Sequence, residues 1–437
     1  VKDGDTTSER FFTEISEALA PEQLRLEKNY RQKSSYPLNL AEMRQALLAQ
    51  NADAASALIA KHGLALGMPS EALRKIDKGA IDRLRLAGSL GILTRSNDEA
   101  LAVESVLWKI GVPSAQGRSD AGDMLTRCIA DAFIACDGET TSKSEFEGAI
   151  AAHDQYKDGC IWKALIGLEG LHLNGDRLRI ESALSALNGA ALPAELTAAR
   201  EESGAVTVST VHAAKGREFD NVWMLAEDLA QFASEKELEE KRVAYVGLSR
   251  GATGIALQCL DEHFLIGGKS TFYSKRNKYI DRICRKRSGG RARNGKTKLV
   301  NIEIKNEKDI DYESFRLFGR AQELLRNGGI EGEPIRLVLN GSGESARYEI
   351  VLQNDESVVL GKMTRVFCDD YKICADYYNR DSIALPDAFD ELYIDRIVTC
   401  IGRSVSDVTY DRSFGDMAVW YGIALGGYAH RDDSQGY

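Results

Sequence analysis

Charged and polar residues gather in two neighbouring blocks, where the pattern predicts the ends of strands and of a helix. The first block, VTVSTVHAAKGREFDNVWML, starts at Val206 and has His212, Lys215 and Glu218 between two apolar runs. The second, EEKRVAYVGLSRGATGIALQC, has Arg250 between an expected helix and a third apolar run. An α/β domain presents charged groups at strand ends to nucleotides. The two blocks therefore indicate a motor domain that acts on a nucleotide and on a charged polymer.

Both blocks resemble the last two conserved motifs of superfamily 1 DNA helicases of the UvrD, PcrA and Rep type. A third block, LRLEKNYRQ (24–32), resembles the motif that opens the second motor domain of those enzymes. The resemblance covers roughly 20–113 and 201–268. Upstream of Asn29 we find neither an ATP-binding lysine loop nor an Asp-Glu pair for magnesium. The resemblance therefore implies a C-terminal portion that supplies one half of a motor.

The resemblance implies roles at the nucleotide. Arg31 and Arg250 resemble the two arginines that offer positive charge to the γ-phosphate of ATP, so they are the expected catalytic residues. A guanidinium suits this task because it stays charged and can donate two hydrogen bonds to phosphate oxygens. Tyr30 resembles the aromatic that stacks on adenine, and Glu218 resembles the acid that reaches the ribose. The expected nucleotide-binding residues are thus Tyr30, Arg31, Glu218 and Arg250.

The resemblance also implies contacts to DNA. Thr210 and His212 resemble residues that meet the DNA backbone, where hydroxyl and imidazole donors are common, and Lys215 follows them. We therefore expect Thr210, His212 and Lys215 to bind DNA. Arg242 and Tyr245 resemble residues on a helix face that brace the cleft between the two motor domains.

Structural interpretations stand beside these roles. Arg250 could be a surface residue that pairs with Glu240, and Tyr245 is as consistent with a core position as with a functional one. The chain also departs from the family pattern at two places. Arg217 stands where family members often have Leu, and Ser249-Arg250-Gly251 stands in place of the usual Thr-Arg-Ala.

Length and composition agree with a soluble globular protein. The 437 residues suffice for two to four domains, and 43% hydrophobic with 28% charged residues is ordinary. No apolar run approaches the roughly 18 residues of a membrane span, and no signal-peptide pattern opens the sequence. The eight cysteines are scattered without a C-x-x-C pair, which favours reduced thiols over disulfides or a zinc site. We expect a cytoplasmic protein that makes no membrane contact.

Charge is unevenly distributed along the chain. Between Lys269 and Lys298, twelve Lys or Arg residues face a single acid, Asp281, which gives a net charge of +11. Subtracting +11 from the overall −10 leaves −21 for the remainder. A basic stretch on an acidic body suits a polyanion confined to one channel, although a solvated linker is an equal alternative.

The hydrophobic pattern predicts an α/β architecture. SLGILTRSN (89–97) has the pattern of a buried parallel strand, and DEALAVESVLWKIGVP that of an amphipathic helix stopped by Gly111 and Pro113. VTVST, NVWMLA and GIALQCL predict three further strands. This alternation, together with the resemblance, predicts a RecA-like motor domain with a parallel sheet, split between 1–113 and 201–268.

The rest of the chain divides into three further segments. Residues 114–200 have helical patterns with no obvious strand, so they predict an inserted helical domain. Residues 269–298 are expected to be a basic linker. Residues 299–437 contain alternating and β-branched runs separated by Gly and Asn turns, which predicts a separate, β-rich α+β domain. The pattern of the last ~35 residues is weak, which suggests a partly loose end.

Two other motifs have less support. Residues 290–297 (GRARNGKT) satisfy the phosphate-loop pattern, but a strand-like run follows them where a phosphate loop needs a helix. Glu303-Ile-Lys305 with Asp281 resembles the acid-x-Lys core of a nuclease, although any solvated strand face can give E-x-K.

These observations lead to one main hypothesis and two alternatives. The chain is expected to be the C-terminal part of an ATP-dependent 3′–5′ DNA helicase that moves on single-stranded or single-strand-tailed DNA. ATP and Mg²⁺ would be bound mainly by a first motor domain, supplied in cis or in trans, and no metal ligands are expected here. The alternatives are a motor-dead DNA-binding or regulatory subunit and a helicase-nuclease.

Overall fold

The computed structural model describes most of the chain after residue 36. The described residues are 14, 17–19, 37–51, 54, 57, 78–86, 88–116, 124–136, 138–151, 159–189, 192–198, 206–226, 235–259, 269–273, 279–287, 298–378, 384–402 and 418–432. The block at 24–32, with Tyr30 and Arg31, lies outside them. No helix among the described residues is long and apolar enough to cross a membrane.

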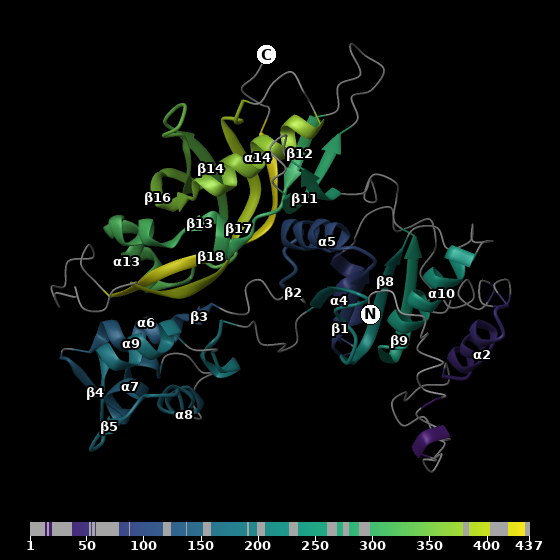
Figure 1. The fold of residues 1–437 in the computed structure, drawn as a ribbon, viewed down its shortest axis with the longest axis horizontal. Coiled ribbons are helices and arrows are strands. Elements are labelled where there is room, and N and C mark those ends of the chain that lie inside the picture. Colours follow the sequence, from purple (N-terminus) through teal and green to yellow (C-terminus); the bar gives the residue numbers. More distant parts are fainter. Residues whose placement is uncertain are drawn as a thin grey trace.

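A five-stranded parallel sheet forms one part of the molecule (Figure 1). Its order is β2-β7-β1-β8-β9. The strands are β1 (Leu90–Thr94), β2 (Ser114–Gln116), β7 (Val206–Thr210), β8 (Phe219–Ala226) and β9 (Gly251–Cys259). Every residue of the central strand β1 is buried, as expected for a parallel strand covered on both faces. The sheet and the four runs predicted as its strands are confirmed.

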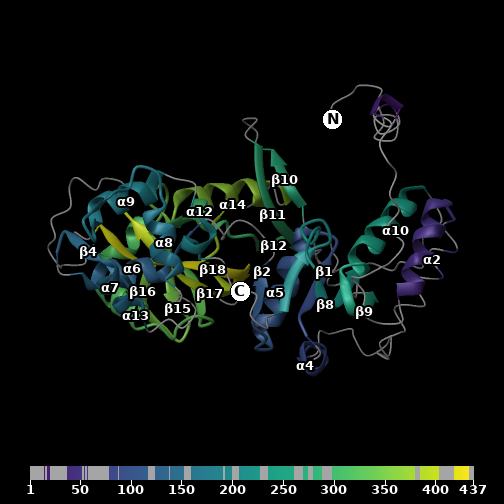
Figure 2. The same ribbon diagram turned by 90° about the horizontal axis from the view of Figure 1, so that it is seen from below.

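Helices cover both faces of this sheet. The helices are α2 (Pro37–Leu48), α4 (Lys78–Leu86), α5 (Asn97–Lys109) and α10 (Glu235–Leu248). On one face, Val103 and Leu107 of α5 pack with Trp223 in a core that also includes α4. On the other face, α2 and α10 lie side by side (Figure 2), and their buried residues share a core with Met224. Helix α5 begins with a capping box between Ser96 and Glu99.

The segment between β2 and β7 is mostly helical. It contains α6 (Arg127–Ala135), α7 (Lys143–Ile150), α8 (Cys160–Ile166), α9 (Ile180–Gly189) and the 3₁₀ turn η3 (Ala194–Leu196). It also contains strands that the sequence pattern did not indicate: β3 (Leu125–Thr126) and a small antiparallel sheet of β4 (Thr140–Ser142), β6 (Arg177–Arg179) and β5 (Leu173–Asn174). Two or three residues are too few to show an alternating pattern.

A large antiparallel sheet forms the other main part of the molecule. Its strand order is β10-β11-β12-β18-β17-β14-β15-β16-β13, with β3 added on β17. The strands are β10 (Lys269–Tyr273), β11 (Tyr279–Arg287), β12 (Lys298–Ile302), β13 (Ile310–Asp311), β14 (Pro334–Asn340), β15 (Arg347–Leu352), β16 (Asp355–Met363), β17 (Ala388–Ile401) and β18 (Val419–Asp432). Its other elements are α12 (Asn306–Asp309), η5 (Tyr312–Leu317), α13 (Gly319–Asn327) and α14 (Arg365–Tyr378). Helix α14 packs on the sheet through Phe367 and Tyr371, which contact Phe389.

The segment expected to be a basic linker, 269–298, instead contains β10, β11 and the first residue of β12. Ile280, Arg282 and Cys284 alternate on β11 and are all buried. Arg282 is tolerated there because Asp309 and Asp370 neutralise it, with an Nη2–Oδ2 distance of 2.8 Å to Asp370. The sequence pattern did not reveal this alternation, because one of the buried positions is Arg282. The acidic partners of this arginine come from distant segments.

The last ~35 residues, which the sequence pattern suggested are partly loose, are described only at 418–432, and this part is ordered as strand β18. The rest of that segment lies outside the described residues. Strand β18 spans 14 residues in the interior of the antiparallel sheet, and its first eleven residues are all buried. Its glycines allow close packing, since a Cβ at Gly426 would lie 2.3 Å from the ring of Tyr393. Large residues on a neighbouring strand thus fill the space above small ones, and this complementarity is invisible in the local pattern.

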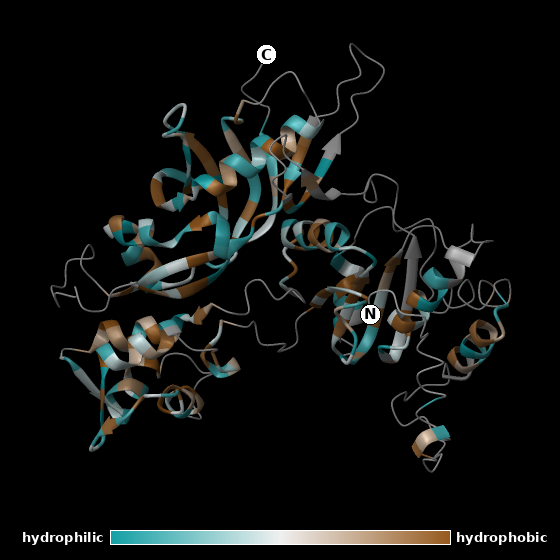
Figure 3. Ribbon diagram, in the orientation of Figure 1, coloured by the Kyte–Doolittle hydropathy of each residue, from teal (hydrophilic) through white to brown (hydrophobic). Residues whose placement is uncertain are grey.

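The segments expected as separate helical and β-rich domains pack together. Leu125 and Thr126 of β3 pair with Thr399 and Val398 of β17. One continuous hydrophobic core includes Phe133 of α6 together with buried residues of the antiparallel sheet. Helix α5 lies between this assembly and the parallel sheet (Figure 1), and Figure 3 shows both hydrophobic and hydrophilic residues along it.

Candidate nucleotide and nucleic-acid site

The connection from β7 to β8 presents the residues expected to bind DNA. It crosses the end of β1, where the amide of Val211 donates a hydrogen bond to the carbonyl of Thr94 at 2.9 Å. The buried Val211 and Ala214 anchor the turn in the core beside α10. His212 and Lys215 are exposed. The turn therefore places a ring nitrogen donor and an ammonium group on the surface at the carboxyl edge of the sheet.

Thr210 has a local structural role as well. Its side-chain oxygen accepts a hydrogen bond from the amide of Ala213 at 3.2 Å, and its carbonyl accepts one from the amide of Ala214 at 3.0 Å. These bonds close the first turn after β7. Thr210 is half-buried, so its hydroxyl lies at the base of the exposed turn rather than at its tip.

Glu218 and Arg250 lie next to each other in the fold, although 32 positions separate them. Each immediately precedes a strand, and the amide of Phe219 donates a hydrogen bond to the carbonyl of Arg250 at 3.0 Å. Glu218 is exposed and Arg250 is half-buried. The structure thus brings together an acid and an arginine that the sequence predicted at one nucleotide site.

The guanidinium of Arg250 is oriented by the end of its own helix. Its Nε donates a hydrogen bond to the carbonyl of Val246 at 3.1 Å, and Nη2 donates one to Oγ of Ser249 at 3.2 Å. Glu240, the alternative partner, forms its described hydrogen bonds with Arg95. A guanidinium at a helix carboxyl end also interacts favourably with the helix dipole.

The two groups of residues lie at opposite edges of the parallel sheet. Val206 of β7 and Asn221 of β8 both pair with Leu90 of the central strand. Thr210 lies four residues after that level, and Phe219 lies two residues before it. At the usual rise of a strand, these six residues correspond to about 20 Å. A nucleotide near Arg250 and a polymer near His212 would therefore occupy separate places, connected by the turn between them.

Arg95 is a charged residue of this region that the sequence analysis did not select. It follows β1 and forms two hydrogen bonds with Glu240 of α10, at 2.7 Å from Nε and 2.9 Å from Nη2. The hydrogen bonds that Arg95 donates to Glu240 raise the pKa of Arg95 above its usual value, although partial burial opposes the shift. In the sequence, Arg95 stands in TRSN (94–97) at the end of an expected strand, and this position could have identified it. The pair joins the end of the central strand to the first half of α10.

Two further residues of α10 that the resemblance singled out, Arg242 and Tyr245, differ in their exposure to solvent. Arg242 is exposed, whereas Tyr245 is half-buried and packs against the core beneath the helix. Tyr245 therefore fits the structural interpretation, and Arg242 stays a predicted contact of the cleft.

The two less supported motifs are clarified by their flanking strands. Residues 290–297 lie outside the described residues, but the strands on either side of them, β11 and β12, pair directly as antiparallel neighbours with Arg287 opposite Lys298. A hairpin of two strands lacks the helix that a phosphate loop requires. In the E-x-K motif, Lys305 lies 3.5 Å from Asp281, but Glu303 is buried and accepts a hydrogen bond from the amide of Ile283. The pair is thus an ion pair beside a structural glutamate.

Comparison with known proteins gives one family match. Residues 174–257 match the family model of the UvrD-like helicase C-terminal domain. This range runs from β5 to β9 and contains Thr210, His212, Lys215, Glu218 and Arg250. No curated protein matches the chain. The resemblance to the C-terminal portion of UvrD-type superfamily 1 helicases is thereby confirmed.

Proposed function

We propose that this chain supplies the second, RecA-like motor domain of an ATP-dependent DNA helicase or translocase of the UvrD-like family, moving 3′ to 5′. The observation that carries the proposal is the arrangement within the matched range. Glu218 and Arg250 meet at one edge of a parallel sheet, and Thr210, His212 and Lys215 lie at the other. A motor needs these two sites to be separate yet connected by a short segment of chain.

At the nucleotide edge, Arg250 is the proposed catalytic residue of this chain. Its hydrogen bonds to Val246 and Ser249 hold the guanidinium beside the start of β9, and Glu218 would accept hydrogen bonds from the ribose hydroxyls. Tyr30 and Arg31 would complete the site. ATP and Mg²⁺ would be held mainly by the first motor domain, which supplies the phosphate loop. An arginine of this kind contributes about 10³–10⁵-fold to the rate in related nucleotide hydrolases.

At the DNA edge, the turn after β7 would contact the phosphate backbone of a single strand. Lys215 offers a mobile ammonium, and His212 and Thr210 offer hydrogen-bond donors of moderate strength. Such contacts carry no sequence information, so the strand can slide past them. Movement of this turn would link the nucleotide site to the strand, because its two ends continue into β7 and into Glu218.

The test is DNA-stimulated ATP hydrolysis by this chain, alone and mixed with a separately expressed first motor domain of a UvrD-like helicase. We expect hydrolysis only in the mixture, and a loss of at least about 10³-fold with Arg250→Ala while DNA binding is kept. Arg83→Ala, which removes an exposed arginine of α4, is the matched control and should leave the rate unchanged. Full activity of Arg250→Ala would overturn its assignment. Salt-sensitive DNA binding without hydrolysis in any mixture would favour a motor-dead DNA-binding subunit.

A further inference from the structure

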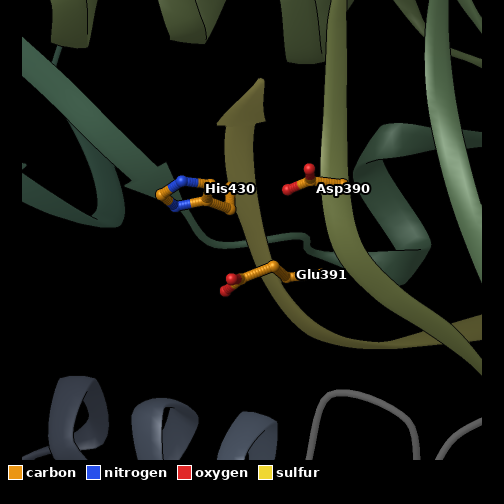
Figure 4. A group of neighbouring side chains, drawn as sticks. All are labelled: Asp390, Glu391 and His430. Atoms are coloured by element: carbon orange, nitrogen blue, oxygen red, sulfur yellow. The ribbon is translucent and has the colours of Figure 1, made fainter. Parts of the chain in front are cut away.

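Three side chains with metal-binding atoms converge on the antiparallel sheet, away from the proposed motor site. Asp390 and Glu391 of β17 and His430 of β18 project their side chains to the same side of the two strands (Figure 4), and one ligand atom of each lies within 4.8 Å of the others. We propose that these three residues bind one divalent transition-metal ion, Zn²⁺ or Mn²⁺. This inference does not depend on the proposed helicase function.

The backbone explains how two consecutive acids, Asp390 and Glu391, both come close to the ring of His430. Asp390 pairs directly with His430 across the two strands, which brings their side chains to the same face. Side chains at neighbouring positions of a regular strand point to opposite faces, so Glu391 would normally point away. A register shift between Asp390 and Leu392, with φ of 61° at Glu391, breaks this alternation. The irregularity thus turns the second carboxylate toward the histidine.

A second, independent observation concerns the carboxylate of Asp390. The Oδ1 atom of Asp390 is buried, and it has no hydrogen-bond partner among the residues that the structure describes. Buried carboxylate oxygens are nearly always paired, and one without a protein partner requires an explanation such as a bound ion. A cation held between Asp390 and Glu391 would give this oxygen a partner.

The charged residues around the cluster are compatible with a bound metal ion. Asp432 also lies near the cluster, but it forms an ion pair with Arg336. Lys109 of α5 contacts one oxygen of Glu391, with an Nζ–Oε1 distance of 2.6 Å. A metal ion must therefore share Glu391 with Lys109 or displace it.

The ligand set favours particular ions. An imidazole nitrogen suits zinc and other transition metals, whereas Mg²⁺ and Ca²⁺ prefer oxygen ligands alone. Two carboxylates beside one imidazole fit Zn²⁺ and Mn²⁺, with water completing the coordination. With bonds of about 2.0–2.2 Å to the metal, ligand atoms lie roughly 3–4 Å apart, so the three side chains need to close by about 1 Å. Rotation of the half-buried side chain of Glu391 away from Lys109 can supply part of this movement.

The site would connect metal binding to the position of α5. Helix α5 packs on the parallel sheet, and Lys109, the last residue of this helix, contacts the proposed ligand Glu391. The Lys109 ammonium and the metal ion would compete for the Glu391 carboxylate. Metal binding would therefore alter this contact between the two sheet assemblies. Replacing Lys109 with methionine should therefore strengthen metal binding, because it removes both the competitor and a nearby positive charge.

The experiment is calorimetric titration of the full chain, stripped of metal with a chelator, with Zn²⁺, Mn²⁺ and Mg²⁺ in turn. We expect one equivalent of Zn²⁺ or Mn²⁺ to bind, at least tenfold more tightly than Mg²⁺. His430→Gln and Asp390→Asn should each weaken binding at least tenfold. His172→Gln and Asp355→Asn, which change an exposed histidine and an exposed acid elsewhere, are the matched controls and should bind as the wild type does. Lys109→Met should bind more tightly.

Contrary outcomes are equally clear. Absence of binding to the wild type, or equal affinity of His430→Gln and the wild type, would overturn the site. Equal or weaker binding by Lys109→Met would overturn the competition. If the ligand variants do not fold, broadening of the His430 ring signals by Mn²⁺ in the wild-type NMR spectrum gives a second test. Unaffected His430 signals at saturating Mn²⁺ would then contradict the proposal.

Discussion

The hydroxyl of Tyr428 donates a hydrogen bond to Oδ1 of Asp98 at 2.9 Å, although the two residues are 330 positions apart. Arg285 contacts the other carboxylate oxygen at 3.2 Å and lies over the ring of Tyr428. These contacts join the beginning of α5, which packs on the parallel sheet, to β18 and β11 of the antiparallel sheet. The two sheets are therefore connected by a buried polar cluster.

The other end of α5 makes a second connection. The ring of Trp108 stacks on that of Tyr393, with centroids 5.0 Å apart, and its Nε1 donates a hydrogen bond to the carbonyl of Gly332 at 2.9 Å. With Lys109 beside them, these residues hold α5 at both ends. A movement of the parallel sheet would thus be transmitted through α5 to the antiparallel sheet.

Tyr428→Phe should lower the free energy of unfolding by about 1–3 kcal/mol, because it leaves a buried oxygen of Asp98 without its donor. Chemical denaturation measures the loss. In a double-mutant cycle with Asp98→Ala, the two effects should not add, since both changes break the same bond. Strict additivity would show that the hydrogen bond contributes nothing to stability.

Asp370→Asn should lower the free energy of unfolding by about 3 kcal/mol at neutral pH, because it removes one of two acids that neutralise the buried Arg282. Burial alone would raise the pKa of Asp370, but hydrogen bonds from Lys308 and Arg282 outweigh it and lower the pKa. A lowered pKa contributes stability above the unfolded value of about 3.9, and this contribution is lost as the pH falls through the folded value.

The difference between the wild type and Asp370→Asn should therefore shrink in denaturation curves measured below about pH 4. Asp355→Asn removes an exposed acid that pairs with Arg320, and it should leave the free energy of unfolding almost unchanged. A difference that stays constant from neutral to acidic pH would show that Asp370 does not carry its charge into the buried cluster.

Gly427→Ala should destabilise the protein by about 1–3 kcal/mol, because Gly427 has φ of 97° and an added Cβ would lie 2.4 Å from the carbonyl oxygen of Glu391. Gly148→Ala is the matched control. Gly148 lies in α7 with no atom within 4 Å of an added Cβ, so alanine there should stabilise by about 0.5–1 kcal/mol. Thermal unfolding of both variants checks the pair, and a neutral Gly427→Ala would contradict the expected clash.

Lys215→Ala should weaken binding to single-stranded DNA and lower the slope of log K against log salt by about 0.7, the value for one phosphate contact on a single strand. Binding should weaken equally for all sequences, because the contact is to phosphate. Lys163→Ala, on the exposed side of α8, is the control and should keep the full slope. Fluorescence anisotropy at several salt concentrations measures both. An unchanged slope for Lys215→Ala would remove this residue from the DNA contact.

The parallel sheet and the order of its motifs could be predicted from the amino-acid sequence alone. Buried parallel strands such as LGILT and VTVST are continuous apolar runs, and the helix from Asn97 to Lys109 begins with a capping box and is followed by Gly111. These are local signals, each contained in about ten residues. The sequence also placed Glu218 and Arg250 directly before strands, where the structure brings them together.

The remaining features could not be predicted from the sequence, because they depend on contacts between segments far apart in the chain. The basic stretch forms strand β11 since Asp309 and Asp370 neutralise Arg282, and β18 is buried since Tyr393 packs over Gly426. The cluster of Asp390, Glu391 and His430 depends on a strand irregularity and on a partner strand 40 residues away from Asp390. Local periodicity reports which residues turn inward, but it does not report which distant residues they meet.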